Sequence, residues 1–311
     1  MDYGRIIKNT FTLWYKDGPT IKYMLIYFLA GLAFMLLLVG AIFFFFGNIA
    51  STYLDIAKNS QISVGPPFVS ETEIASLITG FFSNILPFLL IIVPIFIIFS
   101  LLQWFIQLLM LGRGLQVVGF KTASLDVFKF LRVIVLELWV AVAAVTSWYN
   151  RKFMYVFLGL IVLFFIGIIA TILNGMIGGI ILLIWLLVFL VYFIVIIYNA
   201  LRLTFSCAIF LQKDQSVVQT ARESWDFTQG RVGDILVALL IVGIAVAIVS
   251  FLLFIPSFIL QFVLGLMNQQ ILSAVLSELY SLVLSPIFVA LGVYASASIY
   301  GEISATKGGL K

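Results

Sequence analysis

Six stretches of about twenty or more residues contain no charged side chain, and they constrain the fold more than any other feature. They cover residues 23–46, 85–111, 153–173, 176–198, 235–254 and 279–300. A helix needs about 20 apolar residues to cross the ~30 Å hydrocarbon core of a bilayer. Only 10% of the residues are charged, against about 25% in soluble domains. The sequence therefore predicts an all-α integral membrane protein with six transmembrane helices in one polytopic domain, residues 1–311.

A tryptophan motif recurs three times along the chain. Trp14, Trp148 and Trp225 each end a stretch of mixed polarity, and basic or turn residues and then an apolar stretch follow. Internal repeats of this kind define architecture before any single segment is assigned. We expect three repeats, approximately 1–112, 113–200 and 201–311. Each would be a transmembrane hairpin preceded by an amphipathic helix on the cytoplasmic surface.

The charges predict which side of the membrane each segment faces. With six spans, the outer segments are 47–84, 174–175 and roughly 255–278, and they hold one of the 17 basic residues and four of the 13 acidic ones. Sixteen bases and nine acids remain on the inner side, a net charge of +7. Lys and Arg accumulate on the cytoplasmic side of membrane proteins. We therefore expect a plasma-membrane protein whose N- and C-termini are both cytoplasmic.

Two segments leave the span count open. Residues 124–146 begin as an amphipathic helix with Ser124 as N-cap, but 133–149 is apolar and just long enough to cross, which would give seven spans. The position of Trp148 in the repeat and the charge distribution favour six. Residues 256–278 are apolar but contain several Gln and Asn, and we interpret them as a re-entrant or interfacial segment on the outer side.

The third tryptophan stretch has the clearest helix signals. Ser216 and Gln219 fit a capping box, and Gly230 fits a C-terminal stop. We expect Trp225 at the membrane interface, with Arg222 and Arg231 towards lipid phosphates.

Residues 221–231, Ala-Arg-Glu-Ser-Trp-Asp-Phe-Thr-Gln-Gly-Arg, lead directly into a span. This motif resembles the signature of the multi-pass family that includes the membrane domain of glycerophosphoryl diester phosphodiesterases and the YciC-like proteins. Residues 3–7 and 121–125 are similar to that family's opening and central segments. The resemblance implies a six-span fold of repeated surface-helix hairpins. It implies no catalytic role, since the family's membrane part has none assigned.

Polar side chains in a hydrocarbon layer are costly and are therefore candidates for function. Gln103 and Gln107 share one face of the second span and could form interhelical hydrogen bonds or line a polar path. Glu137 lies among apolar neighbours and needs a partner, for which Arg113 or Arg132 is available.

The end of the fourth span carries two further polar residues, Asn199 and Arg202. Asn199 is a candidate for the same polar path, and both residues are expected to act chiefly as interfacial anchors.

Histidine is absent from the chain and cysteine occurs only once, as Cys207. The chain therefore forms no internal disulfide and has no histidine-liganded metal or histidine base. We expect neither enzymatic activity nor a cofactor.

Three function classes are compatible with these features: a translocation channel or membrane subunit of a transport machine, a structural or lipid-organising membrane protein, and, with the least support, an intramembrane enzyme. Size, span count and the basic inner face resemble the membrane-channel component of the crenarchaeal DNA-import system, which works with a cytoplasmic ATPase. Composition is compatible with an archaeal host. Expected partners are the bilayer, other membrane subunits, an ATPase and DNA as transported substrate. The expected partner-binding inner face carries Trp14, Trp148, Trp225, Arg151, Lys152, Arg222 and Arg231.

Overall fold

The computed structural model describes residues 1–62, 71–213, 215–267 and 269–306, and its regular structure there is entirely helical. Helices that satisfy their backbone groups internally are the form in which a single apolar segment can cross a bilayer. The helices are α1 (Tyr3–Lys16), α2 (Gly18–Ile62), α3 (Glu71–Val118), α4 (Val127–Thr146), α5 (Arg151–Leu173), α6 (Gly175–Leu203), α7 (Ser206–Gln212), α8 (Val217–Phe227), α9 (Val232–Leu266) and α10 (Gln270–Thr306).

Six helices of the described part are long and apolar enough to cross a membrane. They are Gly18–Gly47, Ile78–Val118, Arg151–Leu173, Gly175–Gln212, Val232–Leu266 and Leu272–Thr306. The predictions of an all-helical fold and of six helices able to span a membrane are therefore confirmed for the described residues. The α4 helix is not among the six, because Lys129, Arg132 and Glu137 interrupt its apolar sequence.

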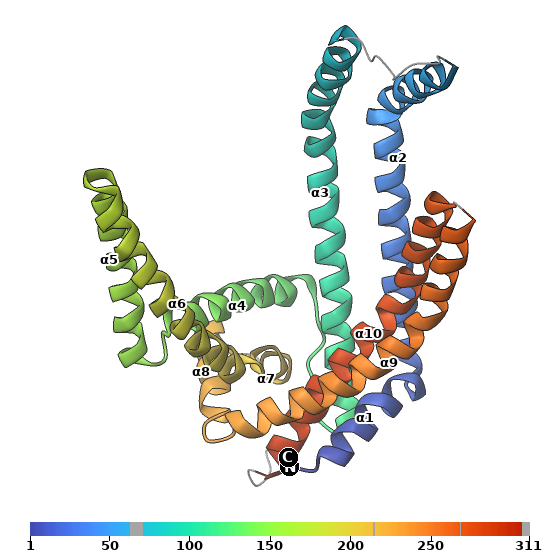
Figure 1. The fold of residues 1–311 in the computed structure, drawn as a ribbon. Coiled ribbons are helices and arrows are strands. Elements are labelled where there is room, and N and C mark those ends of the chain that lie inside the picture. The colour runs from blue at the N-terminus through green and yellow to red at the C-terminus, as the bar shows by residue number, and fades with distance from the viewer. Residues whose placement is uncertain (63–70, 214, 268, 307–311) are drawn as a thin grey trace.

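Consecutive long helices lie side by side as pairs: α2 with α3, α5 with α6, and α9 with α10 (Figure 1). The α5–α6 pair is especially close, since a Cβ atom on Gly178 would overlap the backbone of Thr171. The α10 helix also packs against α1, α2 and α3, whereas α5–α6 reaches the remaining helices through α4, α8 and α9. The α5–α6 pair consequently stands apart from the other four long helices in Figure 1.

Several predicted segment ends are wrong. The α3 helix continues through Pro87 and Pro94 and beyond Leu111, the predicted end of the second span, so that it includes Arg113. Most of the expected outer loop 47–84 is helical as well, since α2 extends to Ile62 and α3 begins at Glu71; residues 63–70 lie outside the described part.

The expected separate re-entrant or interfacial segment 256–278 is not seen, because its described residues up to 266 belong to α9 and those from 270 belong to α10. One of the polar residues that suggested it, Gln261, contributes to the contact between these two helices. The Gln261 side chain donates hydrogen bonds to Ser257 Oγ at 3.3 Å and Ser277 Oγ at 2.7 Å. Interhelical bonds of this kind satisfy polar groups that would otherwise be stranded in hydrocarbon.

The buried core lies at one end of the molecule, which we call the basal end and define by α1, α7 and α8. The first cluster joins α1, α7, α8, the start of α9 and the end of α10 around Ile6, Phe205 and Tyr300. A second cluster joins α4, α6, α7 and α8 around Leu136, Phe210 and Trp225. The N-terminus and the end of α10 meet here, where Arg5 lies 3.4 Å from Glu302 (Figure 1).

The α4 helix extends across the space between α3 and the α5–α6 pair rather than alongside either (Figure 1). Its N-cap is Asp126, whose carboxylate accepts a hydrogen bond from the Lys129 amide at 2.7 Å, so the prediction of Ser124 is wrong. One side of α4, including Val133 and Leu136, is buried in the basal core.

Candidate functional site: a polar junction at the basal end

The side chain of Arg202, at the end of α6, is the centre of the polar junction. Its Nε and Nη2 donate hydrogen bonds to the Trp225 carbonyl oxygen at 3.2 and 2.5 Å. Its guanidinium lies 4.0 Å from the centroid of the Trp225 ring, a close cation–π contact. The Arg202 carbonyl in turn accepts hydrogen bonds from the hydroxyls of Ser224 and Thr228 on α8. These contacts fasten α8 to the end of α6.

Arg202 and Trp225 are buried within the protein, and their expected place at the membrane interface stays a prediction. They are only 7% and 8% exposed, because each covers the other. The α8 helix itself has the predicted ends: Ser216 Oγ accepts from the Gln219 amide at 3.4 Å, and Gly230 has φ +74° just beyond the helix. The sequence predicted the position of the α8 helix. It did not predict that the Trp225 side chain points into the protein core.

A second set of polar contacts joins α6 to the end of α4. Asn199 Nδ2 donates to the Ala144 carbonyl at 2.9 Å and to Ser147 Oγ at 2.8 Å. Ser147, in the left-handed region with φ 55°, is the C-cap of α4 and also hydrogen-bonds to the Tyr192 hydroxyl at 2.8 Å. Asn199 is fully buried and makes interhelical hydrogen bonds, while its expected place at the membrane interface stays a prediction. It closes the α4 terminus, where free carbonyls need donors.

Glu137 has a partner that the sequence did not suggest. Its carboxylate accepts a hydrogen bond from the Cys207 thiol of α7 at 2.6 Å. Neither proposed arginine takes this role: Arg113 binds Asp17, and Arg132 donates to the Gln215 carbonyl and lies 5.1 Å from the centroid of the Phe210 ring. The contact joins α4 to α7 within the second core cluster.

Asp17 and Arg113 form an ion pair that connects the start of α2 to the end of α3. Arg113 Nε lies 3.0 Å from both carboxylate oxygens of Asp17, and Nη2 lies 2.8 Å from Oδ1. Thr20 donates its amide and hydroxyl to the same carboxylate and hydrogen-bonds to the Tyr294 hydroxyl of α10. Burial raises the pKa of Asp17, but the bonds from Arg113 and Thr20 and the arginine charge outweigh it and hold that pKa below its ordinary 3.8.

The turn between α4 and α5 adds an aromatic connection to the junction. Tyr149 accepts a hydrogen bond from Trp139 Nε1 at 3.0 Å, and its ring centroid lies 5.6 Å from that of Trp225. Burial raises the pKa of Tyr149 above its ordinary 10, against the lowering effect of the Trp139 bond. The phenol stays neutral at physiological pH and ties α4 to α8.

The three repeat tryptophans have three different environments. Trp14 is half-buried on α1 with its indole N–H unpaired, Trp225 is buried on α8, and Trp148 is 52% exposed. Trp148 follows α4 instead of lying on it, and its ring contacts Trp139 at a centroid distance of 5.4 Å. The expectation of equivalent positions on surface helices does not hold for Trp148.

The predicted basic residues remain near the protein surface. Arg151 and Lys152 at the start of α5 and Arg222 on α8 are exposed, while Arg231 is half-buried and lies 3.5 Å from Asp234.

The four predicted polar residues do not form one path. Glu137 and Asn199 both contribute to contacts of α4, but Gln103 lies on α3 beside Gly31 of α2. Gln103 and Gln107 are half-buried, and within the described residues neither makes a hydrogen bond.

Sequence reasoning missed the Asp17–Arg113 pair and Tyr192. Asp17 directly precedes the first span, and a charged residue at the start of a span is a sequence feature that could have marked it as a candidate. Nothing in the sequence predicts that its partner is a residue on the next span.

The contacts of the junction hold the helices of the basal end together. The charged groups of the junction are mostly engaged with one another or with backbone carbonyls, and the described residues contain no group of three metal-ligating side chains. The polar contacts hold α4, α7 and α8 in place and leave basic side chains exposed around them. No family model matches the chain, and no curated protein or solved structure shows significant similarity to it.

Proposed function

We propose that this chain is a non-enzymatic membrane subunit of a transport machine, with its basal end on the cytoplasmic side as the docking surface for a partner. In this arrangement the three helix pairs are the transmembrane hairpins, and α1, α4 and α8 lie on the inner surface. The observation that carries the proposal is the contrast within the basal end. Its interior is closed by the Arg202, Asn199 and Asp17 contacts, whereas its exposed side chains are predominantly basic.

The exposed basic residues determine the kind of partner. Arg5, Lys8, Lys16, Lys22, Lys121, Arg151, Lys152 and Arg222 are exposed in the structure. Such a surface attracts polyanions, including DNA, and acidic protein surfaces. Together with the resemblance noted above, it favours DNA import driven by a separate cytoplasmic ATPase. The six apolar stretches of the sequence contain no charged residue that could couple transport to an ion gradient, so an external energy source fits better.

A gene deletion tests the proposal directly. We expect the deletion strain to lose DNA uptake and a copy of the wild-type gene to restore it. The double variant Arg151→Gln and Lys152→Gln should restore it only in part, because it removes two exposed inner charges without disturbing the core. Glu278→Gln is the matched control, an exposed residue at the opposite end of α10.

Unchanged DNA uptake in the deletion strain would refute the import proposal. If that strain instead shows altered lipid order or leakage, and purified protein retains anionic lipids without an ATPase, the lipid-organising alternative is correct. The same basic residues would then bind headgroups, each contributing about 1 kcal/mol.

A further inference from the structure

The α2–α3 pair is longer than the other two helix pairs. The α2 and α3 helices have 45 and 48 residues, whereas α5 and α6 have 23 and 29. At 1.5 Å per residue α3 is about 72 Å long, more than twice the ~30 Å hydrocarbon core of a bilayer. In Figure 1 the far ends of α2 and α3 extend beyond the ends of the other pairs.

The polar junction gives a reference level for these lengths. Charged groups avoid hydrocarbon, so the Asp17–Arg113 ion pair marks one membrane surface. Tyr294 of α10 lies at the same level, since its hydroxyl is 2.8 Å from that of Thr20. The α10 helix begins at Gln270, 24 residues before Tyr294, and therefore reaches about 36 Å from the reference level. This height matches the hydrocarbon core and one interface.

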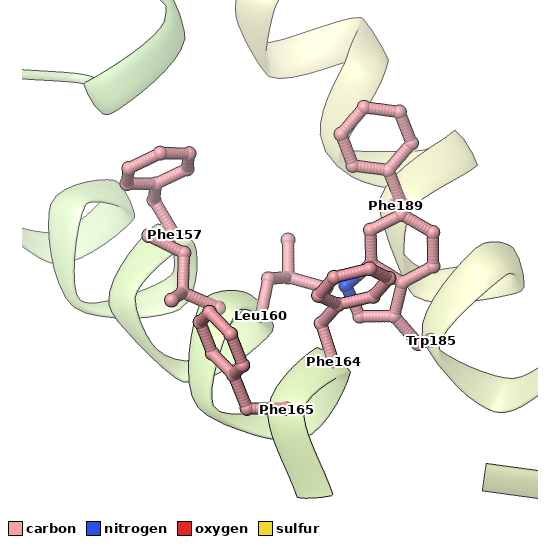
Figure 2. Close-up of a pocket in the computed structure, with 7 residues that line it drawn as sticks. Phe157, Leu160, Phe164, Phe165, Trp185 and Phe189 are labelled. Carbon is pink, nitrogen blue, oxygen red and sulfur yellow. The ribbon is translucent and has the colours of Figure 1, made fainter. Parts of the chain in front are cut away.

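The α5–α6 pair also fits the bilayer. Phe164, Phe165 and Trp185 are among the apolar side chains that line the crevice between the two helices (Figure 2). Trp185 lies ten residues after Gly175, the first residue of α6, which is about 15 Å along the axis. Acyl chains can cover rings at that depth, so this surface needs no protein partner.

On α3 the apolar surface continues past the bilayer thickness. Ile78, Phe82 and Leu86 follow one another every four residues on one face and are 51%, 66% and 63% exposed. Phe82 lies 31 residues before Arg113, about 46 Å from the reference level. Acyl chains do not reach that height. The sequence nevertheless has no charge between Glu73 and Arg113.

The α2 helix adds an exposed ring to the same face. Phe46 of α2 contacts Phe81 of α3 at a centroid distance of 5.7 Å. From this contact, the step back to Phe43 turns α2 by about 60°, and the step on to Phe82 turns α3 by about 100°. In an antiparallel pair these turns lead to the same side. Phe43, 73% exposed, therefore lies beside Phe82; we call residues 43–46 and 78–86 the outer extension.

Polar side chains return in this part of α3. Residues 85–99 are all apolar, whereas Thr79, Ser83 and Asn84 lie in the outer extension. An all-apolar sequence is typical of hydrocarbon, and the polar residues mark where the helix leaves it. The exposed face of the extension still offers roughly 400 Å² of apolar surface. Surfaces in water rarely carry larger contiguous apolar patches, and such patches mark interaction sites.

The same face continues into the membrane as a helix-packing seam. On α3 it includes, every three or four residues, the exposed side chains of Phe82, Leu86, Leu89, Val93 and Phe96. This spacing is typical of helices that pack side by side along their length. A partner that covers the outer extension can therefore follow α3 into the bilayer.

The partner must present an uncharged apolar surface at the same height above the membrane. Among the described residues, α9 and α10 end lower and α5–α6 is shorter, so this chain offers such a surface only on the outer extension itself. Two copies in one membrane hold their extensions at equal heights. A twofold axis perpendicular to the membrane then brings the same face of each copy together.

We propose that the outer extension and the seam below it form a self-association surface, through which two copies of this chain pair in the membrane. The two extensions together bury roughly 800 Å² above the bilayer, and the seam adds to this area within it. No charged residue of 23–54 or 74–112 has to be desolvated, because these segments contain none. The pairing does not depend on what the chain transports.

The first test measures self-association of the full-length protein in liposomes. Fluorescently labelled protein is diluted with lipid, and photobleaching steps count the copies in each vesicle. We expect pairs for the wild type and an at least tenfold weaker association for the double variant Phe43→Ala and Phe82→Ala. Phe165→Ala with Phe251→Ala is the matched control. These rings are 57% and 64% exposed at lipid depth, so the control should pair as the wild type does.

The second test locates the contact. In a Cys207→Ala background, spin labels are attached to Ser83→Cys on the outer extension or to Met176→Cys at the outer end of α6. Both side chains are exposed, and Ser83 lies beside the apolar face, so its label leaves the contact intact. Distance measurement between the two copies should place the labels at position 83 closer together than those at position 176.

Four results would overturn the proposal. Two are single copies of the wild type at every dilution and unchanged pairing of the Phe43→Ala and Phe82→Ala double variant. The third is a shorter distance between the labels at position 176 than between those at position 83. The fourth is relaxation of the label at position 83 by oxygen dissolved in lipid and not by a water-soluble nickel complex, which would show that the hairpin tilts until acyl chains cover its end.

Discussion

At the scale of single residues, the arginine at the end of α6 is the side chain whose role depends most on its surroundings. Planar guanidinium groups combine fixed hydrogen-bond directions with stacking on aromatic rings, and lysine does not reproduce this combination. Arg202 uses both properties on the same residue, since it binds the Trp225 carbonyl and covers the Trp225 ring. The position of α8 should therefore depend on an arginine rather than on a positive charge alone.

The Arg202→Lys variant tests this dependence. We expect a loss of about 1.5–3 kcal/mol in the free energy of unfolding, the usual contribution of hydrogen bonds to a charged group. Thermal unfolding in detergent, followed by tryptophan fluorescence, measures it. Arg222→Lys on the exposed side of α8 is the control and should stay within about 0.5 kcal/mol. Equal effects of the two substitutions would contradict the assigned role.

The Asp17–Arg113 pair predicts a specific pH dependence. The folded-state pKa of Asp17 is lowered, so its stabilising effect is complete above the unfolded value of about 3.8 and is lost as pH falls through the lower folded value. Above pH 5 the free energy of unfolding of the wild type should exceed that of Asp17→Asn by about 1–3 kcal/mol, because Arg113 loses its ionic partner in the variant. The difference should shrink below pH 4.

Unfolding midpoints measured from pH 3 to pH 7 in detergent provide this comparison. Asp234→Asn is the control, since the Asp234 carboxylate is 42% exposed and its 3.5 Å pair with Arg231 should contribute little. A constant difference between wild type and Asp17→Asn across the whole range would show that the carboxylate charge is not what stabilises α2 against α3.

At the scale of secondary-structure elements, α4 determines the membrane topology of the chain, because it could be a seventh span or a surface helix. Its sequence alone is compatible with either a seventh span or a surface helix. In the structure α4 packs against α6, α7 and α8. Because it carries three charged side chains, it is not one of the six helices that are apolar enough to cross a membrane. Asn199 and Ser147 end it in a tight turn that leads into α5.

Cysteine labelling tests this threading. In a Cys207→Ala background, Arg151→Cys and Lys213→Cys should react with a membrane-impermeant maleimide only after the inner face is opened, if α4 lies on the inner surface as we propose. Glu278→Cys, at the far end of α10, should react in intact cells. Labelling of either inner position in intact cells would show that α4 crosses the membrane.

At the scale of the whole molecule, the six apolar helices and the basal end are stabilised by different surroundings. Apolar side chains around the long helices are exposed in the structure, for example Phe44 at 81% and Leu173 at 81%. A surface of that kind is stable only when lipid covers it. The basal end, in contrast, has an interior of its own in which Tyr294 and Phe210 are fully buried.

The sequence by itself determined the properties that depend on length and composition. The span count, the all-helical fold and the ends of α8 follow from apolar stretches and from local signals such as Ser216 and Gly230, because these act within a few residues of the chain. The ends of the long apolar helices were harder to predict from the sequence, because Pro87 and Pro256 lie inside helices that continue through them.

Only the tertiary structure decided which polar residues meet. Asp17 and Arg113 are far apart in the chain, as are Glu137 and Cys207, and their pairing depends on how α2, α3, α4 and α7 pack. Trp225 and Arg202 carry sequence signals typical of a membrane interface, yet they bury each other. Sequence pattern reports the preference of each side chain for water or lipid; the partner that changes this preference comes from another helix, so only the folded structure shows it.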